Sequence, residues 1–210
     1  MNDPLTRSER NVIAHVFAGF LFNPLDESYP QGVSAFLEQA KILPKGTSPL
    51  RSEEVTVAYE AQMRDLLYLR PSDSPLPSTD VTPSATAFDV VIQFRNVLTC
   101  LEVKFLTGWN PAQIEQELKD CGRIKKMRGY DQCSLVLLYP SWRTPQGIPP
   151  EVIKMEWQAI RQICHELRDK RLPAERIITW MESLRVPLTI SDHGSQSPNT
   201  KGLFDLPRKH

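Results

Sequence analysis

The sequence lacks the long apolar runs of membrane proteins and the short motifs of several enzyme classes. No apolar run approaches the ~18 residues of a membrane-spanning helix, and the first ten residues lack the charged-then-apolar pattern of a signal peptide. No internal repeat, P-loop, dinucleotide fingerprint, G-x-S-x-G motif or zinc pattern is present. We therefore expect a cytoplasmic protein that makes no membrane contact.

Cysteine is scarce, and neither sign of charge dominates. The four cysteines, at positions 100, 121, 133 and 164, form no C-x-x-C pair, which favours reduced thiols over disulfides or zinc. Lys and Arg number 25, as do Asp and Glu, so the net charge of zero argues against coating nucleic acid by charge alone. With 210 residues, 40% of them hydrophobic, the chain is long enough for one α/β domain with a real core.

The most informative stretch runs from Ala87 to Phe105, and it reads as two strands joined by a tight turn. Phe88, Val90, Ile92 and Phe94, with Leu101, Val103 and Phe105 on the second strand, are expected on one core-facing side. A two-residue turn at Arg95-Asn96 places Asp89 directly opposite Glu102 on the other side.

Two directly opposed carboxylates repel each other, so a sheet needs a reason to keep them. A divalent cation between Asp89 and Glu102 is one such reason, because Mg²⁺ takes oxygen ligands and retains waters and phosphate. Lys104 lies two residues beyond Glu102 on the same face, where its ammonium can hold a water or a phosphate oxygen. The pattern predicts metal-assisted phosphodiester hydrolysis.

Asp89, followed after twelve residues by Glu102-Val103-Lys104, resembles the core motif of the PD-(D/E)XK phosphodiesterase superfamily, which has the restriction-endonuclease-like fold. Phe88 stands where the family name has Pro. The resemblance implies that Asp89 and Glu102 bind Mg²⁺ or Mn²⁺, with the backbone carbonyl of Val103 as a further ligand, and that Lys104 assists the attacking water. An ordinary half-buried hairpin is the other interpretation of these residues.

Acidic residues before the hairpin are the next candidates. Ser52, Glu53, Glu54 and the apolar spacing after them predict a helix over residues 51–69. In the superfamily such a helix often supplies a further acidic residue, so Glu60 is implied as a catalytic residue, with Glu53 and Glu54 as alternatives. Two earlier helices, over 5–22 and 31–42, belong to an N-terminal extension, and a Pro/Ser-rich loop occupies 71–86.

After the hairpin, Asn110 and Pro111 start a helix that runs to about Arg123, and an apolar run over 134–139 predicts a buried central strand. Helices over 150–170 and 174–185 and an edge strand over 186–190 follow. Polar and basic residues on and just after the helix that starts at Pro111 are candidates for nucleic-acid contacts: Gln116, Lys119, Arg123, Lys125 and Lys126. A solvated helix end explains the basic residues equally well.

We expect one domain over residues 1–190, a mixed sheet flanked by helices in helix–strand–strand–helix–strand order, and a loose polar tail over 191–210. The leading hypothesis is a metal-dependent nuclease, with DNA favoured over RNA because most members of the superfamily cut DNA. Defence, recombination and repair are all open as settings, and a homodimer or a partner subunit is expected to select the target. The alternatives are an inactive nuclease-like fold that binds nucleic acid or protein, and a small scaffolding protein.

Overall fold

The computed structural model describes residues 13–23, 25–27, 29–47, 50–66, 86–104, 108–141, 143–167, 185–188 and 199–202. Its elements, in chain order, are η1 (Ala14–Leu21), α2 (Tyr29–Gln39), η2 (Ser52–Glu54), β1 (Val55–Gln62), α3 (Met63–Leu66), β2 (Ala87–Phe94), β3 (Val97–Val103), α4 (Pro111–Arg128), β4 (Gln132–Tyr139), β5 (Ile153–Glu156), α5 (Trp157–Leu167), β6 (Arg185–Leu188) and β7 (Asn199–Gly202). Within these described ranges, none of the helices combines the length and the apolarity that a membrane span requires.

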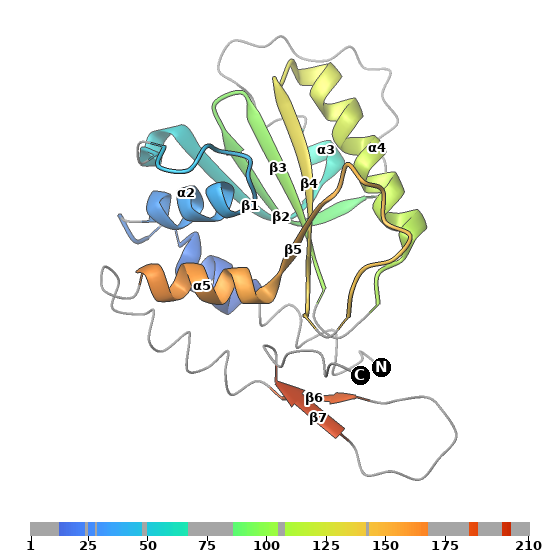
Figure 1. The fold of residues 1–210 in the computed structure, drawn as a ribbon. Coiled ribbons are helices and arrows are strands. Elements are labelled where there is room, and N and C mark those ends of the chain that lie inside the picture. The colour runs from blue at the N-terminus through green and yellow to red at the C-terminus, as the bar shows by residue number, and fades with distance from the viewer. Residues whose placement is uncertain are drawn as a thin grey trace.

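A five-stranded mixed sheet forms the centre of the molecule, with strands in the order β1-β2-β3-β4-β5 (Figure 1). β1, β2 and β3 pair antiparallel, whereas β3, β4 and β5 pair parallel. The parallel step from β3 to β4 needs a crossover, and α4 provides it. The predicted α/β class, a mixed sheet flanked by helices, is therefore confirmed.

The hairpin of β2 and β3 has the predicted two-residue turn. Phe94 pairs with Val97, and the register continues to Val90 with Leu101, which is the register that brings Asp89 opposite Glu102. Arg95 lies in the turn at φ 48°, a left-handed conformation that costs a non-glycine residue about 1–2 kcal/mol. Its guanidinium contacts Glu54 Oε1 at 2.9 Å, at the end of the sheet away from Asp89.

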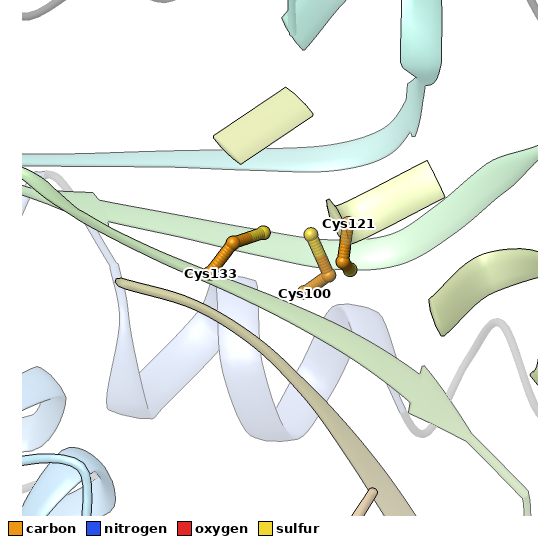
Figure 2. A group of neighbouring side chains, drawn as sticks. All are labelled: Cys100, Cys121 and Cys133. Atoms are coloured by element: carbon orange, nitrogen blue, oxygen red, sulfur yellow. The ribbon is translucent and has the colours of Figure 1, made fainter. Parts of the chain in front are cut away.

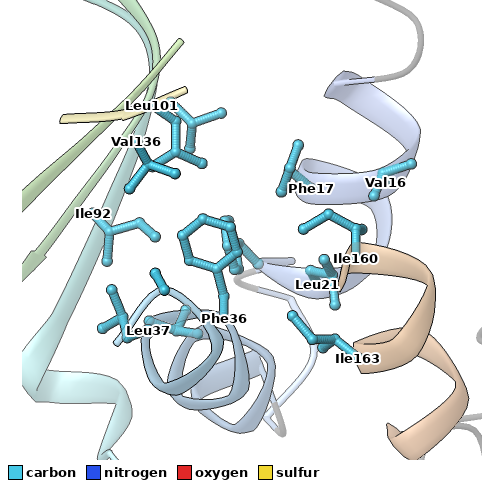
Figure 3. Packing of buried hydrophobic residues seen from close by; sticks show 14 of the residues in the cluster. Val16, Phe17, Leu21, Phe36, Leu37, Ile92, Leu101, Val136, Ile160 and Ile163 are labelled. Carbon is cyan, nitrogen blue, oxygen red and sulfur yellow. The ribbon is translucent and has the colours of Figure 1, made fainter. Parts of the chain in front are cut away.

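Both faces of the sheet are buried, so the prediction of a single core face is wrong. On one face, η1, α2 and α5 pack against alternate residues of the strands and form the larger core. Figure 3 shows part of this core, in which the labelled side chains are Val16, Phe17, Leu21, Phe36, Leu37, Ile92, Leu101, Val136, Ile160 and Ile163. On the other face, α3 and α4 cover a second apolar cluster that includes Val91, Leu98 and Ile114.

Phe88 departs from the expected alternation. It packs in the α4-side cluster, whereas Val90, Ile92 and Phe94 of the same strand lie in the larger core. The partner strand shows the same shift, because Tyr59 packs against the larger core and Ala61 against the α4-side cluster. The alternation is therefore broken on both strands at one level of the sheet, the level of Asp89.

The predicted helix over 51–69 is wrong. Residues 52–54 make one 3₁₀ turn, and Val55–Gln62 is an edge strand that pairs with β2 through pairs such as Val57 with Ile92. The acidic Ser-Glu-Glu start resembles a helix N-terminus, but the following V-T-V-A-Y run is rich in β-branched and aromatic residues that suit a half-buried strand. Apart from the short α3, the order of elements from β1 to β4 is therefore strand–strand–strand–helix–strand, whereas the predicted order began with a helix in place of the first strand.

Other elements agree with the sequence to different degrees. α2, α4 and β4 confirm the predicted helices at 31–42 and 111–123 and the buried strand at 134–139. The predicted helix over 150–170 is wrong in its first part, because Ile153 and Met155 pair with β4 and the helix begins at Trp157. Residues 1–12, 71–85 and 168–184 lie outside the described residues, as does most of the predicted tail. Within that tail, β7 pairs with β6 in a separate two-stranded sheet, so the tail is not uniformly loose, and β6 is an edge strand of this small sheet.

Candidate functional site

Glu102 and Lys104 lie at the carboxyl end of β3, on the side of the sheet that α4 covers. Glu102 is 3% exposed, and its Oε1 forms an ion pair with Lys104 Nζ, whose side chain is 13% exposed. The backbone of Lys104 is fixed at both sides, because its N–H donates to Leu138 O at 2.8 Å and its carbonyl accepts from Trp157 Nε1 at 3.0 Å. The strand end therefore holds a buried carboxylate and its amine in one place.

Asp89 lies across from Glu102 at the point where β2 and β3 separate. The last backbone pair is Val90 with Leu101, and at the next step Asp89 Oδ2 accepts the N–H of Val103 at 2.7 Å. The Asp89 carboxylate thus accepts a hydrogen bond from a strand N–H group that would otherwise need a backbone carbonyl of the neighbouring strand. The predicted register holds from Phe94–Val97 to Val90–Leu101, and extended by one step it places Asp89 across from Glu102, where the regular pairing has ended.

Helix α4 brings two more polar groups to this place. The helix begins where predicted, because Asn110 Oδ1 accepts from Ala112 N at 3.1 Å and Pro111 occupies the first turn. From its first turns, Gln113 Nε2 donates to Glu102 Oε1 at 3.1 Å and to Glu117 Oε1 at 2.7 Å. We call the set Asp89, Glu102, Lys104, Gln113 and Glu117 the carboxylate site.

Glu117 is the least satisfied member of the carboxylate site. Its side chain is fully buried, and its Oε2 has no hydrogen-bond partner among the described residues. Burial, together with the negative charges of Glu102 and Asp89, raises the pKa of Glu117 to about 8, against the opposing effects of Gln113 and Lys104. The charges of Asp89, Glu102 and Lys104 thus all affect the pKa of one buried carboxyl group, that of Glu117.

Glu117 was missed in the sequence, although a signal for it exists. It follows Ile114 by three residues and precedes Cys121 by four, so it lies on the apolar stripe of the helix. An acidic residue on a buried stripe needs a partner or a function.

The upstream acidic candidates lie at opposite ends of β1. Extending the β1–β2 register places Glu60 across from Asp89, where the two strands skip one pair. Glu60 is exposed and has φ 49°, a strained conformation for a non-glycine residue. Glu60 therefore lies across from Asp89 on an edge strand and not on the predicted helix. Glu53 and Glu54 precede Val55, which pairs with Phe94 beside the turn, so these two alternatives lie at the opposite end of the sheet from Asp89.

The predicted nucleic-acid contacts all lie on the exposed side of α4: Gln116, Lys119, Arg123, Lys125 and Lys126. Several are engaged within the helix itself. Gln116 and Arg123 contact the buried Asp120 Oδ1 at 3.2 and 3.3 Å, and Lys119 forms a surface ion pair with Glu115 at 2.7 Å. They extend along α4 from its middle to its last turn, where Lys125 and Lys126 lie, and their role in binding stays a prediction.

The carboxylate site suits a hard divalent cation by the type of its donor atoms, which are carboxylate oxygens that include the buried Glu117 Oε2. Its three carboxylates are not all within 4.8 Å of one another, so they do not form a closed three-ligand site as they stand. A second group suits a metal of a different kind: Cys100, Cys121 and Cys133 have sulfur atoms within 4.8 Å of one another. Among the described residues, these thiols are the one set of three His, Cys, Asp or Glu side chains close enough to share an ion.

Comparison of the chain with family models, with curated proteins and with solved structures finds no match.

Proposed function

We propose that this protein is a Mg²⁺- or Mn²⁺-dependent nuclease with a restriction-endonuclease-like core, and that it hydrolyses phosphodiester bonds of nucleic acid, with DNA favoured over RNA. One observation carries the proposal. The β2–β3 register brings Asp89 opposite Glu102 where the strands separate, with Lys104 paired to Glu102. The element order from β1 to β4, in which α4 connects two parallel strands, supports the same core.

Asp89, Glu102 and the backbone carbonyl of Val103 are the proposed metal ligands. Bound Mg²⁺ would supply Lewis-acid stabilisation of the phosphate and a water of lowered pKa. Lys104 would orient that water and neutralise charge that develops on the phosphate, since its ammonium is already held beside Glu102. Glu60, opposite Asp89 on the exposed edge strand, remains the proposed further acidic residue.

Glu117 would act through its proton. With a pKa of about 8 it holds a proton at neutral pH while the site is empty of cation, which limits the repulsion among the buried carboxylates. A divalent cation favours the ionised form, so binding would release this proton and add a carboxylate ligand or an acceptor for the water. Gln113, which donates to both Glu102 and Glu117, would position the two carboxyl groups.

The test is a cleavage assay on supercoiled plasmid, single-stranded DNA and single-stranded RNA, with Mg²⁺, Mn²⁺ or EDTA. Asp89→Asn and Lys104→Ala should lower metal-dependent cleavage by about 10²- to 10⁴-fold. Glu115→Gln is the matched control, because Glu115 is an exposed α4 carboxylate only two residues from Glu117. Cleavage that persists in EDTA, or that survives both substitutions, would contradict the proposal.

An inactive, nucleic-acid-binding or protein-binding member of the same fold is the alternative, and one observation favours it. Asp89 already accepts a strand N–H, and Glu102 already has Lys104 and Gln113 as partners, so the site is largely satisfied by protein groups alone. Binding of the same substrates without any cleavage, unaffected by the metal, would favour this second function.

A further inference from the structure

Three cysteines from three separate elements come together beneath α4. Cys100 is in the middle of β3, Cys121 is in α4 and Cys133 is near the start of β4, and their Sγ atoms lie within 4.8 Å of one another. Figure 2 shows the three side chains lying close together. Cys100 and Cys121 are 0% and 1% exposed, and Cys133 is partly exposed. We call these three residues the thiol cluster.

The backbone explains why the thiols meet. In the parallel β3–β4 pair, Leu98 is opposite Cys133 and Cys100 is opposite Leu135, so the two cysteines lie diagonally on neighbouring strands. Both pack with the α4-side apolar cluster, to which Cys121 also belongs. The sulfur atoms therefore converge from the sheet and from the helix that covers it.

We propose that Cys100, Cys121 and Cys133 form a three-thiolate site for a soft metal ion, with Cu(I) as the best chemical match. Thiolate sulfur selects Cu(I) and Zn²⁺ over hard cations such as Mg²⁺. With metal–sulfur bonds of about 2.3 Å, three ligands around one ion have sulfur atoms about 4 Å apart, and the three sulfur atoms here all lie within 4.8 Å of one another. Structural Zn²⁺ takes four ligands, whereas the described residues bring three side chains together here.

A small apolar packing role is the competing explanation, and Cys164 illustrates it. Cys164 is fully buried in the larger core on the opposite side of the sheet, among apolar side chains such as Trp157 and Ile160. Packing alone does not require three sulfur atoms at one point, since any small apolar residue fills such space. The convergence at the thiol cluster is the feature that packing leaves unexplained.

The electrostatics around the thiol cluster also suit a thiolate site. Lys125 lies one turn beyond Cys121 on α4, and its positive charge acts on Cys133. Positive charge is therefore available near a negatively charged metal–thiolate centre. Binding would replace the S–H protons of the thiols with metal–sulfur bonds and release these protons to solvent, and no electrons are transferred.

The experiment titrates the full chain, kept reduced by a phosphine under anaerobic conditions, with Cu(I) in competition with a chromogenic Cu(I) chelator; parallel titrations use Zn²⁺. We expect one Cu(I) per chain and an X-ray absorption spectrum with three sulfur neighbours at about 2.3 Å. Cys133→Ser and Cys121→Ser should weaken Cu(I) binding by at least about a hundredfold. Cys164→Ser, at a buried cysteine on the other face, should leave it unchanged.

Three results would overturn the proposal: loss of Cu(I) to the chelator at stoichiometric protein, a first shell with two or fewer sulfurs, or equal binding by Cys133→Ser. The absorption spectrum of the unsubstituted protein decides the matter even if a substituted chain fails to fold. Tighter retention of Zn²⁺ than of Cu(I), with an oxygen or nitrogen neighbour beside the three sulfurs, would overturn the choice of Cu(I).

Discussion

The carboxylate site and the thiol cluster occupy the same face of the same sheet under the same helix, yet they offer opposite kinds of ligand. Glu102 and Cys100 are two residues apart on β3, and Glu117 and Cys121 are one turn apart on α4. The oxygen donors lie at the strand ends where β2 and β3 separate, and the sulfur donors lie where β3 and β4 are paired. The carboxylate site thus draws on β2, β3 and α4, and the thiol cluster draws on β3, α4 and β4.

The two sets differ in their polar partners and not in burial, since Glu102 and Glu117 are almost as buried as Cys100 and Cys121. At the open end of the sheet, Lys104 and the exposed Gln113 stabilise carboxylates that a fully apolar environment would not tolerate. Where β3 and β4 are paired, burial raises the pKa of Cys100, and hydrogen bonds from Cys100 and Cys121 lower the pKa of Cys133. Sulfur tolerates this burial better than oxygen, because an S–H group is a weak hydrogen-bonding partner that packs like a small hydrophobe.

The largest expected effect comes from comparing one substitution in the carboxylate site with one in the thiol cluster. Glu102→Gln should lower Mg²⁺-dependent cleavage by at least about a hundredfold, because it removes a proposed metal ligand and the partner of Lys104, and should leave Cu(I) binding intact. Cys133→Ser should do the reverse. Cleavage rates and Cu(I) competition, measured on both variants, check this prediction. If either substitution abolishes both properties while circular dichroism shows a folded chain, the two sites are not independent.

The next effect concerns the buried carboxyl of Glu117. Its pKa of about 8 in the fold exceeds the ordinary value of 4.5, so the folded chain binds more protons between these pH values and stability falls as the pH rises through this window. Glu117→Gln, which carries no charge, should remove this loss. At pH 8 the variant should be more stable than the unsubstituted chain, by at most about 5 kcal/mol. Urea unfolding at pH 5 and pH 8 without divalent metal measures the difference.

Two further results bear on Glu117. Glu115→Gln, on the exposed side of the same helix, is the control and should leave this pH dependence in place. Added Mg²⁺ should narrow the gap at pH 8 between the unsubstituted chain and Glu117→Gln, because the cation favours the ionised carboxylate. A stability of the unsubstituted chain that rises from pH 5 to pH 8, relative to the variant, would contradict a protonated Glu117.

A smaller effect concerns the reactivity of the thiols in the absence of metal. Because the Cys133 thiolate accepts hydrogen bonds from Cys100 and Cys121, iodoacetamide at pH 6–7 should modify Cys133 first, with a pH midpoint near 5. Cys121→Ala removes one donor and should move the midpoint upward. Mass spectrometry of the modified chain identifies the residue. Preferential modification of Cys164 would show that the thiol cluster does not activate Cys133.

The sequence predicted the parts of these sites that depend on local pairing. The alternation of Ala87–Phe105 and its turn at Arg95-Asn96 predicted the β2–β3 register, and with it the opposition of Asp89 and Glu102. The assignment of a helix to 51–69 failed, because acidic residues before V-T-V-A-Y suggested a helix cap while pairing with β2 determined the strand. Local propensity decided the first case, and a long-range sheet contact decided the second.

Neither Glu117 nor the thiol cluster was predicted. The spacing of Glu117 from Ile114 and Cys121 places it on the apolar side of the helix, but the residues that it meets there, and the meeting of the three cysteines, depend on how α4 packs across β3 and β4. Cys100, Cys121 and Cys133 have no metal-binding spacing, yet the crossover from β3 to β4 brings them together. Long-range packing thus created the soft ligand set, and local pairing created most of the hard one.

The smallest expected effect tests whether the turn or the strands hold the register on which the carboxylate site depends. Arg95→Gly relieves the φ of 48° but removes a contact with Glu54 in which the arginine side chain is 67% exposed, so the two changes should nearly cancel, to within about 1 kcal/mol. If the buried faces of β2 and β3 hold the register, cleavage and Cu(I) binding should both be unchanged in this variant. If the turn holds it, cleavage should fall, because Asp89 slips past Glu102, while Cu(I) binding persists, because Cys100, Cys121 and Cys133 depend on β3, α4 and β4 and not on β2. Thermal unfolding, the cleavage assay and the Cu(I) competition on the one variant distinguish these outcomes.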